Sequence, residues 1–505
     1  MNTLPLLSLI VFLPWLGALV LAVLPQLRAG ACRGLTLAFS LTTLVLGLVA
    51  LAGFNPAAGL QFTEQHAWIP SLHVTYHLGL DGLSLLLVLL TGIVGPASWL
   101  ASWRETRDVR LFGLCFLVLQ GAALGVFLTL DFFPWFVFWE LSLVPAFFLI
   151  KLWGGPGASR AAYQFMIYTM GGSAFMLAGF AALYAVTGTL DFTTLAGLRA
   201  DGTLGHILGG TWGLVVFAGI LFGLAVKVPL FPFHTWLPAA YAEAPTGASM
   251  FLTGVMSKMG VYGFLRILWP LFPAQLHAWA TPLLWLALGG VVLGAFAALR
   301  QTDLKRMIAY SSVNHLSYCL LALFAVSASL GAQLSAAGAV AAFSGTLLQV
   351  FNHGLSASAL FFCLGVLESR NGGRRGLADF GGVRTAMPVF AGLCGVALFS
   401  SLGLPGLNGF VGEFLIFKGV FALTPWAAAV ATLGLLTTAL FLLTFWQKVF
   451  HGPVGGSVAT FADVTALELV ILVPGVVLMF VLGIYPQLLA GLINPLVTSW
   501  AAHLP

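Results

Sequence analysis

Charged side chains are scarce in this 505-residue chain: they make up 7% of it, with 20 Lys and Arg against 15 Asp and Glu. A soluble domain carries about 25% charged residues, so a water-soluble fold of this size is excluded. Disorder is excluded for the opposite reason, because 60% of the chain is hydrophobic and has ample apolar surface to bury. A mean hydropathy of +1.03 indicates a polytopic helical membrane protein. A β-barrel would show alternating strands of about ten residues, whereas these apolar runs are continuous.

Cysteine is also rare. The five cysteines are far apart and no C-x-x-C pair occurs: Cys32, Cys115, Cys319, Cys363 and Cys394. Neither a zinc site nor an iron–sulfur site is therefore predicted. No nucleotide-binding loop or nucleophile elbow is present. The net charge of +5 is not concentrated in one segment, so no nucleic acid partner is expected.

A membrane span needs about 20 apolar residues. The apolar runs predict about 14 helices, at 4–25, 32–53, 79–100, 111–130, 132–150, 161–187, 207–229, 246–269, 274–298, 304–326, 335–367, 386–417, 427–447 and 466–490. The first run is expected to be a span and not a removed signal peptide. Most of the lysines and arginines fall in the loops after odd-numbered helices. The positive-inside rule then places those loops in the cytoplasm and both termini on the outer side. Arg199 and Arg266 are expected in outer loops.

Ionisable residues inside the apolar runs are the functional candidates, because a charge at the bilayer centre costs about 2.5–3.5 kcal/mol on insertion scales. Glu140 is the ninth of the 19 residues between Asp131 and Lys151, FFPWFVFWELSLVPAFFLI. At 1.5 Å per residue it lies near mid-membrane. The alternative is a structural ion pair with a neighbouring helix.

Lys227 is the only formal charge among the 36 residues from Ile207 to Ala242, a stretch too long for one helix. Lys227 begins the segment KVPLFPFHTWLP, in which Pro229 follows two residues later. Proline interrupts a helix. A helix broken after the lysine is predicted, and broken helices are tolerated only in protein-lined or watery cavities. His234 lies at the end of this segment. The alternative is a simple kink with a snorkelling lysine.

A second interruption is predicted in SLGLPGLNGFVGEFLIFKG, where Pro405 precedes Glu413. Two broken helices in comparable positions indicate an internal-repeat transporter. Lys258 lies deep in the helix after the first break, and Gly254 and Gly260 would allow close approach by neighbouring helices.

His315 and His353 lie inside apolar segments between the two breaks. With an ordinary pKa near 6.5, imidazole takes and releases protons at neutral pH. Structural, hydrogen-bonded histidines are the alternative. The set lacks the close spacing of a metal site, so proton transfer gated by rearranged ion pairs is the predicted mechanism. Moving a charge against the membrane potential costs about 2.3 kcal/mol per 100 mV, so a partner must supply the energy.

Several stretches resemble the antiporter-like membrane subunits of respiratory complex I: LGLDGLSLLLVLLT, FFPWFVFWELSLVPAFFLIKLWGG, KVPLFPFHTWLPAAYAEAPTGASMFLTGVMSKMGVYGF, DLKRMIAYSSVNHLSY and GLPGLNGFVGEF. Glu413 resembles the M type (chain 4), whereas L- and N-type and Mrp subunits usually carry lysine there. Ala239 and Tyr241 depart from the frequent family motif HTWLPDAHxEAPT.

The resemblance implies that Glu140 pairs with Lys227, that Lys258 is the central relay, and that Glu413 closes the second half-channel. The histidines at 315 and 353 would lie along the hydrophilic axis. It also implies two inverted five-helix repeats at 111–270 and 271–450, flanked by N-terminal helices at 1–110 and a C-terminal helix at 451–505. No redox cofactor would bind here; NADH, FMN, iron–sulfur clusters and quinone would belong to partner subunits, with L- and N-type neighbours in the cell (inner) membrane.

Two other functions remain open. The chain could be a homologous subunit of an Mrp-type cation/proton antiporter, a membrane-bound hydrogenase or a CO2-uptake/bicarbonate complex. It could also be a scaffold or an independent transporter whose buried charges are only structural. Genes beside this one would separate the respiratory subunit from its homologues.

Overall fold

The computed structural model describes residues 5–330 and 335–502. Its helices are α1 (Leu6–Val23), α2 (Ala29–Gly53), α3 (Gly82–Ala101), α4 (Val109–Leu128), α5 (Phe132–Trp153), α6 (Ala158–Thr187), α7 (Phe192–Ala200), α8 (Thr203–Ile207), α9 (Gly210–Lys227), α10 (Trp236–Glu243), α11 (Thr246–Phe251), α12 (Lys258–Gly263), α13 (Trp269–Leu271), α14 (Pro273–Ala278), α15 (Ala280–Leu299), α16 (Leu304–Ala328), α17 (Ala336–Arg370), α18 (Val383–Ala386), α19 (Pro388–Ser401), α20 (Asn408–Leu423), α21 (Pro425–Phe445), α22 (Ala466–Ile484) and α23 (Gln487–Ala502). Short 3-10 turns cover Pro70–Leu72, Leu377–Asp379 and Val458–Thr460, and π-helical turns cover Leu252–Met256, Phe264–Leu268 and Trp446–Phe450.

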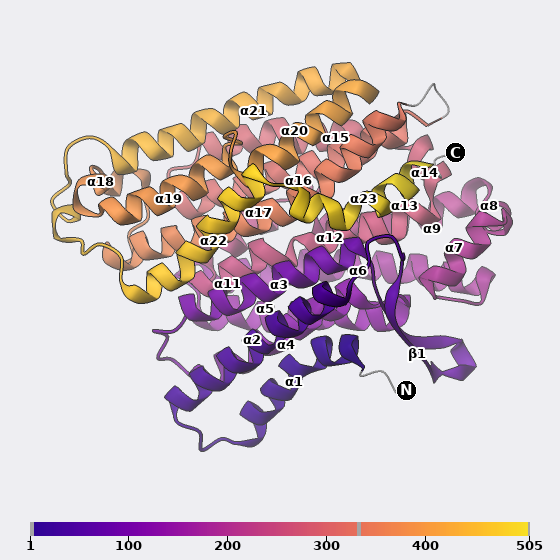
Figure 1. Cartoon of the computed structure of the whole chain (residues 1–505), viewed down its shortest axis with the longest axis horizontal. Coiled ribbons are helices and arrows are strands. Elements are labelled where there is room, and N and C mark those ends of the chain that lie inside the picture. Colours follow the sequence, from indigo (N-terminus) through magenta and orange to yellow (C-terminus); the bar gives the residue numbers. More distant parts are fainter. Residues whose placement is uncertain (1–4, 331–334, 503–505) are drawn as a thin grey trace.

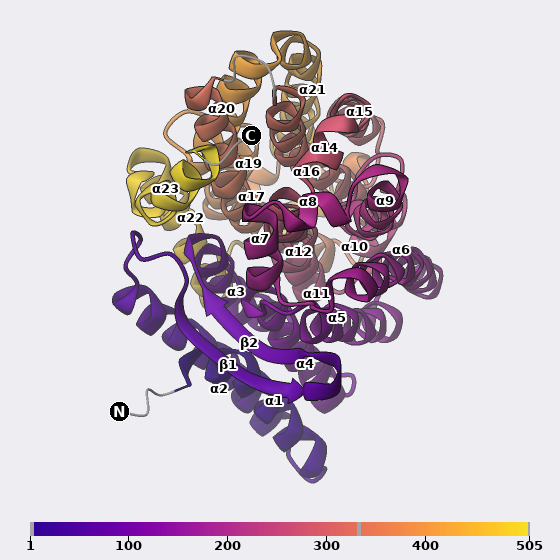
Figure 2. The same ribbon diagram turned by 90° about the vertical axis from the view of Figure 1, so that its right-hand side faces the viewer.

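The helices form an elongated bundle, with the N-terminal helices along one side and α20 and α21 along the other, while α22 and α23 cross the view between them (Figure 1). Viewed along the bundle, the two halves lie next to each other (Figure 2). The long helix α17 joins them, since it packs against α3 and α11 of the first half and against α16, α19, α20, α22 and α23. Twelve of the helices in the described ranges are long and apolar enough to cross a membrane. The polytopic membrane class is thereby confirmed.

The spans predicted at 246–269 and 386–417 are both divided in the structure. Residues 246–271 form α11, α12 and α13, separated by two π-helical turns. The run predicted as one span at 386–417 is two helices, α19 and α20. The total of about 14 spans and the inverted repeats remain predictions.

Both predicted interruptions are present. Helix α9 ends at Lys227, and α10 begins at Trp236; the Val228–Pro229 and Phe231–Pro232 peptides between them are cis. Helix α19 ends at Ser401 and α20 begins at Asn408, with Pro405 in the connection.

Aspartates at the first turn begin several helices. Asp81, Asp131, Asp191 and Asp303 each accept a hydrogen bond from a backbone N–H of the helix that follows, at 2.8–3.0 Å. These side chains satisfy N–H groups that have no partner within the helix. Several of the chain's few acids therefore mark helix ends and are not buried mid-span charges.

A β-hairpin that the sequence did not predict joins α2 to α3. Strands β1 (Gln61–Ile69) and β2 (Val74–Leu80) pair antiparallel at one end of the bundle (Figure 1). Glu64 of β1 accepts the backbone N–H of Leu7 at 2.8 Å and contacts the Ser8 hydroxyl, so the hairpin is fixed to the start of α1. The described chain begins and ends at this same end of the bundle (Figure 1).

Two other expectations need correction. The predicted last span at 466–490 ends at Ile484, and a further helix, α23, follows after Pro486. Arg266 is not in a loop: it lies in the π-helical turn Phe264–Leu268 and pairs with Asp81 at 2.7 Å. This arginine can keep its charge there because the carboxylate of Asp81, at the start of α3, satisfies it.

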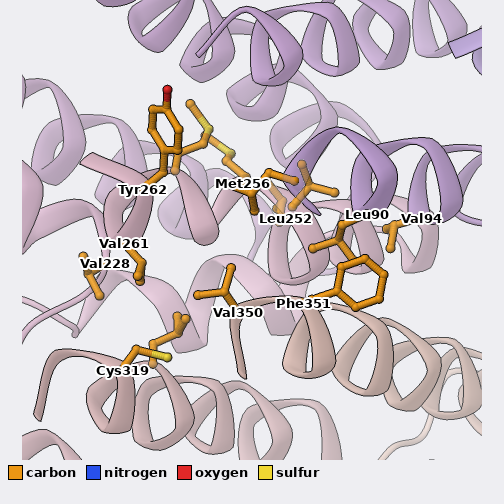
Figure 3. Packing of buried hydrophobic residues seen from close by; sticks show 14 of the residues in the cluster. Leu90, Val94, Val228, Leu252, Met256, Val261, Tyr262, Cys319, Val350 and Phe351 are labelled. Atoms are coloured by element: carbon orange, nitrogen blue, oxygen red, sulfur yellow. The ribbon is translucent and has the colours of Figure 1, made fainter. Parts of the chain in front are cut away.

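Apolar side chains from both halves pack around the divided helix α11–α13. Leu252 and Met256 lie near Leu90 of α3, and Val261 lies beside Val228, with Val350 of α17 between the two groups (Figure 3). Gly254 and Gly260 allow this packing, since a Cβ at Gly254 would lie 2.2 Å from Ser358 Oγ and one at Gly260 would lie 2.9 Å from the Val228 backbone nitrogen. The predicted close approach at both glycines is confirmed.

Candidate functional site

Lys258 lies at the first residue of α12, where the π-helical turn Leu252–Met256 ends, and its side chain is fully buried. Its Nζ has three partners: the Thr253 carbonyl at 2.6 Å, Ser257 Oγ at 3.1 Å and His353 Nδ1 at 2.8 Å. A lysine ammonium has three donors. The three partners of Nζ therefore equal in number the three hydrogens that a protonated lysine can donate.

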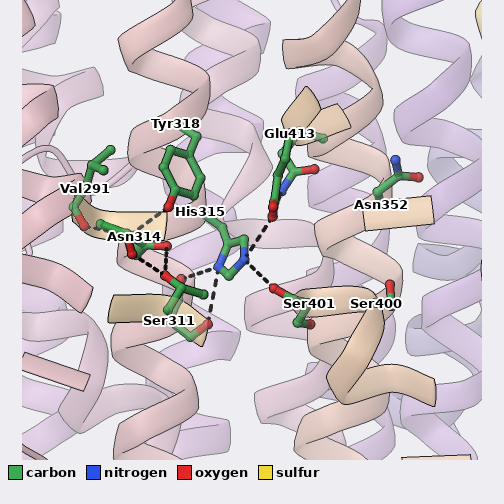
Figure 4. A network of polar contacts seen from close by, with 12 residues as sticks. Val291, Ser311, Asn314, His315, Tyr318, Asn352, Ser400, Ser401 and Glu413 are labelled. Atoms are coloured by element: carbon green, nitrogen blue, oxygen red, sulfur yellow. Dashed lines mark hydrogen bonds and ion pairs between the residues drawn. The ribbon is translucent and has the colours of Figure 1, made fainter. Parts of the chain in front are cut away.

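His353 continues the chain of contacts toward the second half. Its ring on α17 stacks on that of His315 on α16, with centroids 5.3 Å apart. His315 Nδ1 lies 2.7 Å from the Ser311 carbonyl, and His315 Nε2 lies 3.0 Å from the Ser401 carbonyl (Figure 4).

Glu413 ends this line of groups. Its Oε1 lies 3.2 Å from His315 Nε2 and accepts a hydrogen bond from Gln349 Nε2 at 3.1 Å (Figure 4). The carboxyl is 5% exposed. A buried carboxyl is retained where a positive or hydrogen-bonding partner satisfies it. Four predicted residues thus form one contiguous group, which we call the central relay: Lys258, His353, His315 and Glu413.

The second helix break holds Glu413 in place. Gly403 has φ +79° and lies beside the carboxylate, where an added Cβ would be 2.7 Å from Glu413 Oε2. Asn408 at the start of α20 donates to Asn352 Oδ1 of α17 at 3.2 Å, and Asn352 Nδ2 donates to the Asn408 carbonyl at 2.7 Å. The break therefore exposes backbone groups that α17 satisfies, as expected of a divided membrane helix.

Lys227 and Glu140 are close enough to interact electrostatically, but no ion pair within 4.0 Å joins them in the described structure. Lys227 is 2% exposed, and neither its Nζ nor Glu140 Oε1 has a hydrogen-bond partner among the described residues. The Lys227 Nζ lies 5.0 Å from the centre of the Trp139 ring, a cation–π contact. Trp139 in turn donates to Ser173 Oγ at 3.0 Å. The resemblance implied that Glu140 pairs with Lys227. In the structure the two side chains lie near each other but form no direct ion pair or hydrogen bond.

A small cavity borders Lys227. It has a volume of about 10 Å³ and is lined by Phe165, Lys227, Trp236, Ala240, Tyr241, Leu252, Met256 and Ser257. This volume is enough for about one water where polar groups line it, and Lys227, Tyr241 and Ser257 supply such groups in an otherwise apolar lining. Because Ser257 also contacts Lys258, the cavity lies between Lys227 and the central relay.

His234 is separate from these groups. Its half-buried ring stacks on Phe231 with centroids 5.4 Å apart and meets Tyr310 edge-on at 6.2 Å. No hydrogen bond joins it to the central relay in the part of the chain that the structure describes. Pro229 and Pro405 lie in the connections between the helices on either side of the two breaks.

The polar contacts at Ser257, Ser311, Ser401 and Gln349 were not predicted. Ser257 could have been noticed because it directly precedes Lys258 in a long apolar run. The others give no such signal, because isolated serines and glutamines in membrane helices commonly bond to their own backbone.

An ion cluster on the face opposite the hairpin joins the two halves. Arg375 contacts Glu243 at 2.7 Å, Asp303 at 2.6 Å and Glu368 at 3.5 Å, and Lys305 contacts Glu368 at 2.5 Å. Burial disfavours the charged guanidinium, but the facing carboxylates outweigh this and raise the pKa of Arg375. A cavity of about 400 Å³ opens beside the cluster. The Gly- and Arg-rich stretch Glu368 to Arg384, predicted to lie on the membrane surface or against a partner, thus places two arginines inside the fold: Arg375 in this cluster and Arg370, which pairs with Glu468 at 2.7 Å.

At the hairpin end, His77 Nδ1 lies 2.5 Å from Asp191 Oδ2. Burial alone would raise the pKa of Asp191, but hydrogen bonds from His77, Thr193 and Thr194 outweigh it and lower the pKa to about 2. Burial raises the pKa of the neighbouring Asp131.

Residues 129–440 match the family model described as "NADH:quinone oxidoreductase/Mrp antiporter, TM". The chain belongs to this family.

Similar proteins match this chain over nearly its whole length. It is 38% identical to NADH-quinone oxidoreductase subunit M of Rhodobacter capsulatus, over 99% of this chain and 96% of that one. It is 36% identical to F(420)H(2) dehydrogenase subunit M of Methanosarcina mazei, over 96% of this chain and 95% of that one. A chain of respiratory complex I from Thermus thermophilus superposes with a TM-score of 0.86 at 29% identity, covering 99% of this chain and all of the other.

Within this family of antiporter-like membrane proteins, the predicted resemblance and the helical membrane fold are confirmed.

Proposed function

We propose that this chain is the M-type proton-translocating membrane subunit of an NADH:quinone oxidoreductase, and that protons move through Glu140, Lys227, Lys258, His353, His315 and Glu413. The observation that carries the proposal is the contiguous central relay, which runs inside an apolar bundle from Lys258 on the divided helix α11–α13 to Glu413 after the second helix break. Four ionisable side chains in contact there would be costly without a function that needs them.

The central relay supports stepwise proton transfer. Lys258 donates to His353 Nδ1, so a proton can pass from the ammonium to the imidazole along an existing hydrogen bond. The stacked His315 ring is next, and its Nε2 faces the Glu413 carboxylate. Charges this close in a low-dielectric interior change each other's proton affinity strongly. A change in the charge of Lys227 would therefore change the proton affinities of the central relay residues.

The position of Glu140 on α5 supports the proposal that a neighbouring membrane subunit contacts this helix. Phe133, Val137, Val144 and Phe148 are exposed on the same side of α5, at helical spacing around the half-buried carboxyl. A carboxylate in the middle of an apolar helix face is not stable against lipid. We propose that an L- or N-type neighbour covers this face and places a cation or proton donor near Glu140.

The remaining assignments follow from the same proposal. The antiporter-like repeats would be residues 111–270 and 271–450, each with one divided helix, between helices at 1–110 and 451–505. The chain would lie in the cell (inner) membrane with both termini and the hairpin on the outer side. NADH, FMN, iron–sulfur clusters and quinone would act in partner subunits, whose redox reaction supplies the energy.

A different electron donor is the second candidate, because the similarity to a subunit of F(420)H(2) dehydrogenase is nearly as high as to the NADH-linked relative. An Mrp-type antiporter, a membrane hydrogenase and a CO2-uptake complex belong to the same set of homologous machines. Genes next to this one discriminate: subunits for NADH or F420 oxidation and quinone binding favour a redox complex, and cation-antiporter subunits favour Mrp.

The decisive experiment is proton pumping by the assembled complex in lipid vesicles carrying Lys227→Ala or Glu140→Ala. We expect both variants to assemble and to lose pumping by about 10²-fold, the lower range for a removed acid–base group. Lys418→Ala is the matched control, because this lysine is exposed on α20 outside the relay. Normal pumping in both relay variants would show that the buried charges are structural.

A further inference from the structure

Tyr241 stands where the frequent family motif has histidine, and it is not among the predicted relay residues. It lies on α10, directly after the first break, and is 1% exposed. Its ring packs edge-on against Trp236 and Phe361, with centroids 6.4 Å and 6.0 Å away. A tyrosine buried this deeply keeps a partner for its hydroxyl.

The hydroxyl is directed at the π-helical turn that carries Lys258. Tyr241 Oη donates to the Leu252 carbonyl at 3.1 Å, which also accepts the Ser257 backbone N–H at 3.0 Å. Tyr241 Oη also faces the Ser257 hydroxyl. Because a phenol has one proton to donate and this one goes to Leu252, the Tyr241 oxygen can only accept a further hydrogen bond. The Ser257 hydroxyl proton goes to the Thr253 carbonyl, so the donor to Tyr241 would be a water.

Ser257 connects this hydroxyl to the relay lysine. Its Oγ donates to the Thr253 carbonyl at 2.8 Å and accepts from Lys258 Nζ at 3.1 Å. Tyr241, Ser257 and Lys227 also line the same cavity of about 10 Å³. A water there would have the two to four polar partners that a buried water needs.

We propose that Tyr241 is a positioning residue for proton transfer from Lys227 to Lys258, holding one cavity water in line with the Ser257 hydroxyl. This rests on the proposed function. The step follows transfer of a proton from Lys258 to His353, which leaves Lys258 Nζ neutral. A proton then leaves Lys227 Nζ for the water, the water passes a proton to Ser257 Oγ, and the original Ser257 hydroxyl proton turns from the Thr253 carbonyl and moves to Lys258 Nζ. One proton is transferred, and the water and the serine are restored. Tyr241 keeps its own proton on the Leu252 carbonyl.

The test is Tyr241→Phe, which keeps the packed ring and removes only the hydroxyl. In the assembled complex in vesicles, we expect proton pumping to fall about tenfold and the solvent deuterium isotope effect on pumping to increase. Tyr184→Phe is the matched control, because Tyr184 lies 19 residues beyond Phe165 on α6, roughly 28 Å along that helix from the cavity. It should leave both measurements unchanged.

A double-variant cycle distinguishes positioning from a structural role. If Tyr241 acts through Ser257, then Tyr241→Phe combined with Ser257→Ala should pump no more slowly than Ser257→Ala alone. Additive losses would overturn the proposal, and so would loss of assembly in Tyr241→Phe, which would make the hydroxyl structural. Normal pumping in Tyr241→Phe while Lys227→Ala abolishes it would refute the positioning role alone. Normal pumping in both would refute the proposed function as well.

Discussion

His315 and Glu413 lie 98 positions apart in sequence, yet His315 Nε2 and Glu413 Oε1 are 3.2 Å apart inside the bundle. The contact joins α16 to the second half of a divided helix. It brings a group that ordinarily titrates near neutral pH against a carboxylate that is nearly sealed from solvent. This contact connects Glu413, the last residue of the central relay, to the other three.

Glu413→Gln tests the charge of that carboxyl. The amide can still accept the hydrogen bond from Gln349 but cannot carry a negative charge or take up a proton, so we expect pumping to fall by about tenfold or more. Glu413→Asp keeps the carboxylate and should retain part of the activity. Proton uptake in vesicles at matched assembly measures both; equal pumping by the Gln variant and the parent would remove Glu413 from the relay.

Gly260→Ala tests the close packing at the first break. An added Cβ would lie 2.9 Å from the Val228 nitrogen and 3.0 Å from its Cα, and this backbone cannot yield as a flexible side chain would. Overpacking of this kind costs about 1–3 kcal/mol, so the thermal unfolding midpoint of the complex should drop. Gly171→Ala on α6 is the control, since nothing lies within 4 Å of its added Cβ. An unchanged midpoint in Gly260→Ala would show that the break yields easily.

Arg375→Ala tests the ion cluster between the halves. Its removal leaves Glu243 and Asp303 without their guanidinium partner, which costs about 3–5 kcal/mol for a buried pair. These groups are partly exposed, so the loss should fall below that range. Arg375→Lys should recover only part, because an ammonium cannot reproduce the fork that reaches several carboxylates. The measurement is the yield and thermal stability of the assembled complex, and Arg374→Ala is the neighbouring control. Equal stability of Arg375→Ala and the control would contradict this prediction.

Asp191→Asn tests the attachment of the hairpin. The pKa of Asp191 is lowered from 3.8 to about 2 in the folded chain, so its stabilising effect is present above pH 4 and is lost as the pH falls toward 2. This shift corresponds to about 2 kcal/mol. At pH 7 we expect faster hydrogen exchange of the β1–β2 amides in Asp191→Asn, by about tenfold or more. Asp201→Asn, at the exposed end of α7, should exchange like the parent. The difference between Asp191→Asn and the parent should shrink as the pH approaches 2; a difference that persists unchanged would place the hairpin's attachment elsewhere.

Much of the architecture could be predicted from local sequence. The continuous apolar runs predicted the spans, and KVPLFPF and GLPGLNG predicted the two breaks, since proline and glycine act on their own backbone whatever surrounds them. The hairpin at Gln61–Leu80 could not be predicted in this way. Its outer strand is mostly exposed and has no clear alternation of polar and apolar residues, and the fold holds it by Glu64 and His77 contacts with distant segments.

The sequence alone determined which residues are costly in a membrane: Glu140, Lys227, Lys258, His315, His353 and Glu413 stand out because hydrocarbon cannot solvate them. Only the tertiary structure decided which of them meet. It joined four into one row, left Glu140 and Lys227 near each other without a direct bond, and set His234 apart. The physical reason is that hydrogen bonds require atoms within about 3 Å, and that depends on how each helix is rotated and packed against helices far away in sequence.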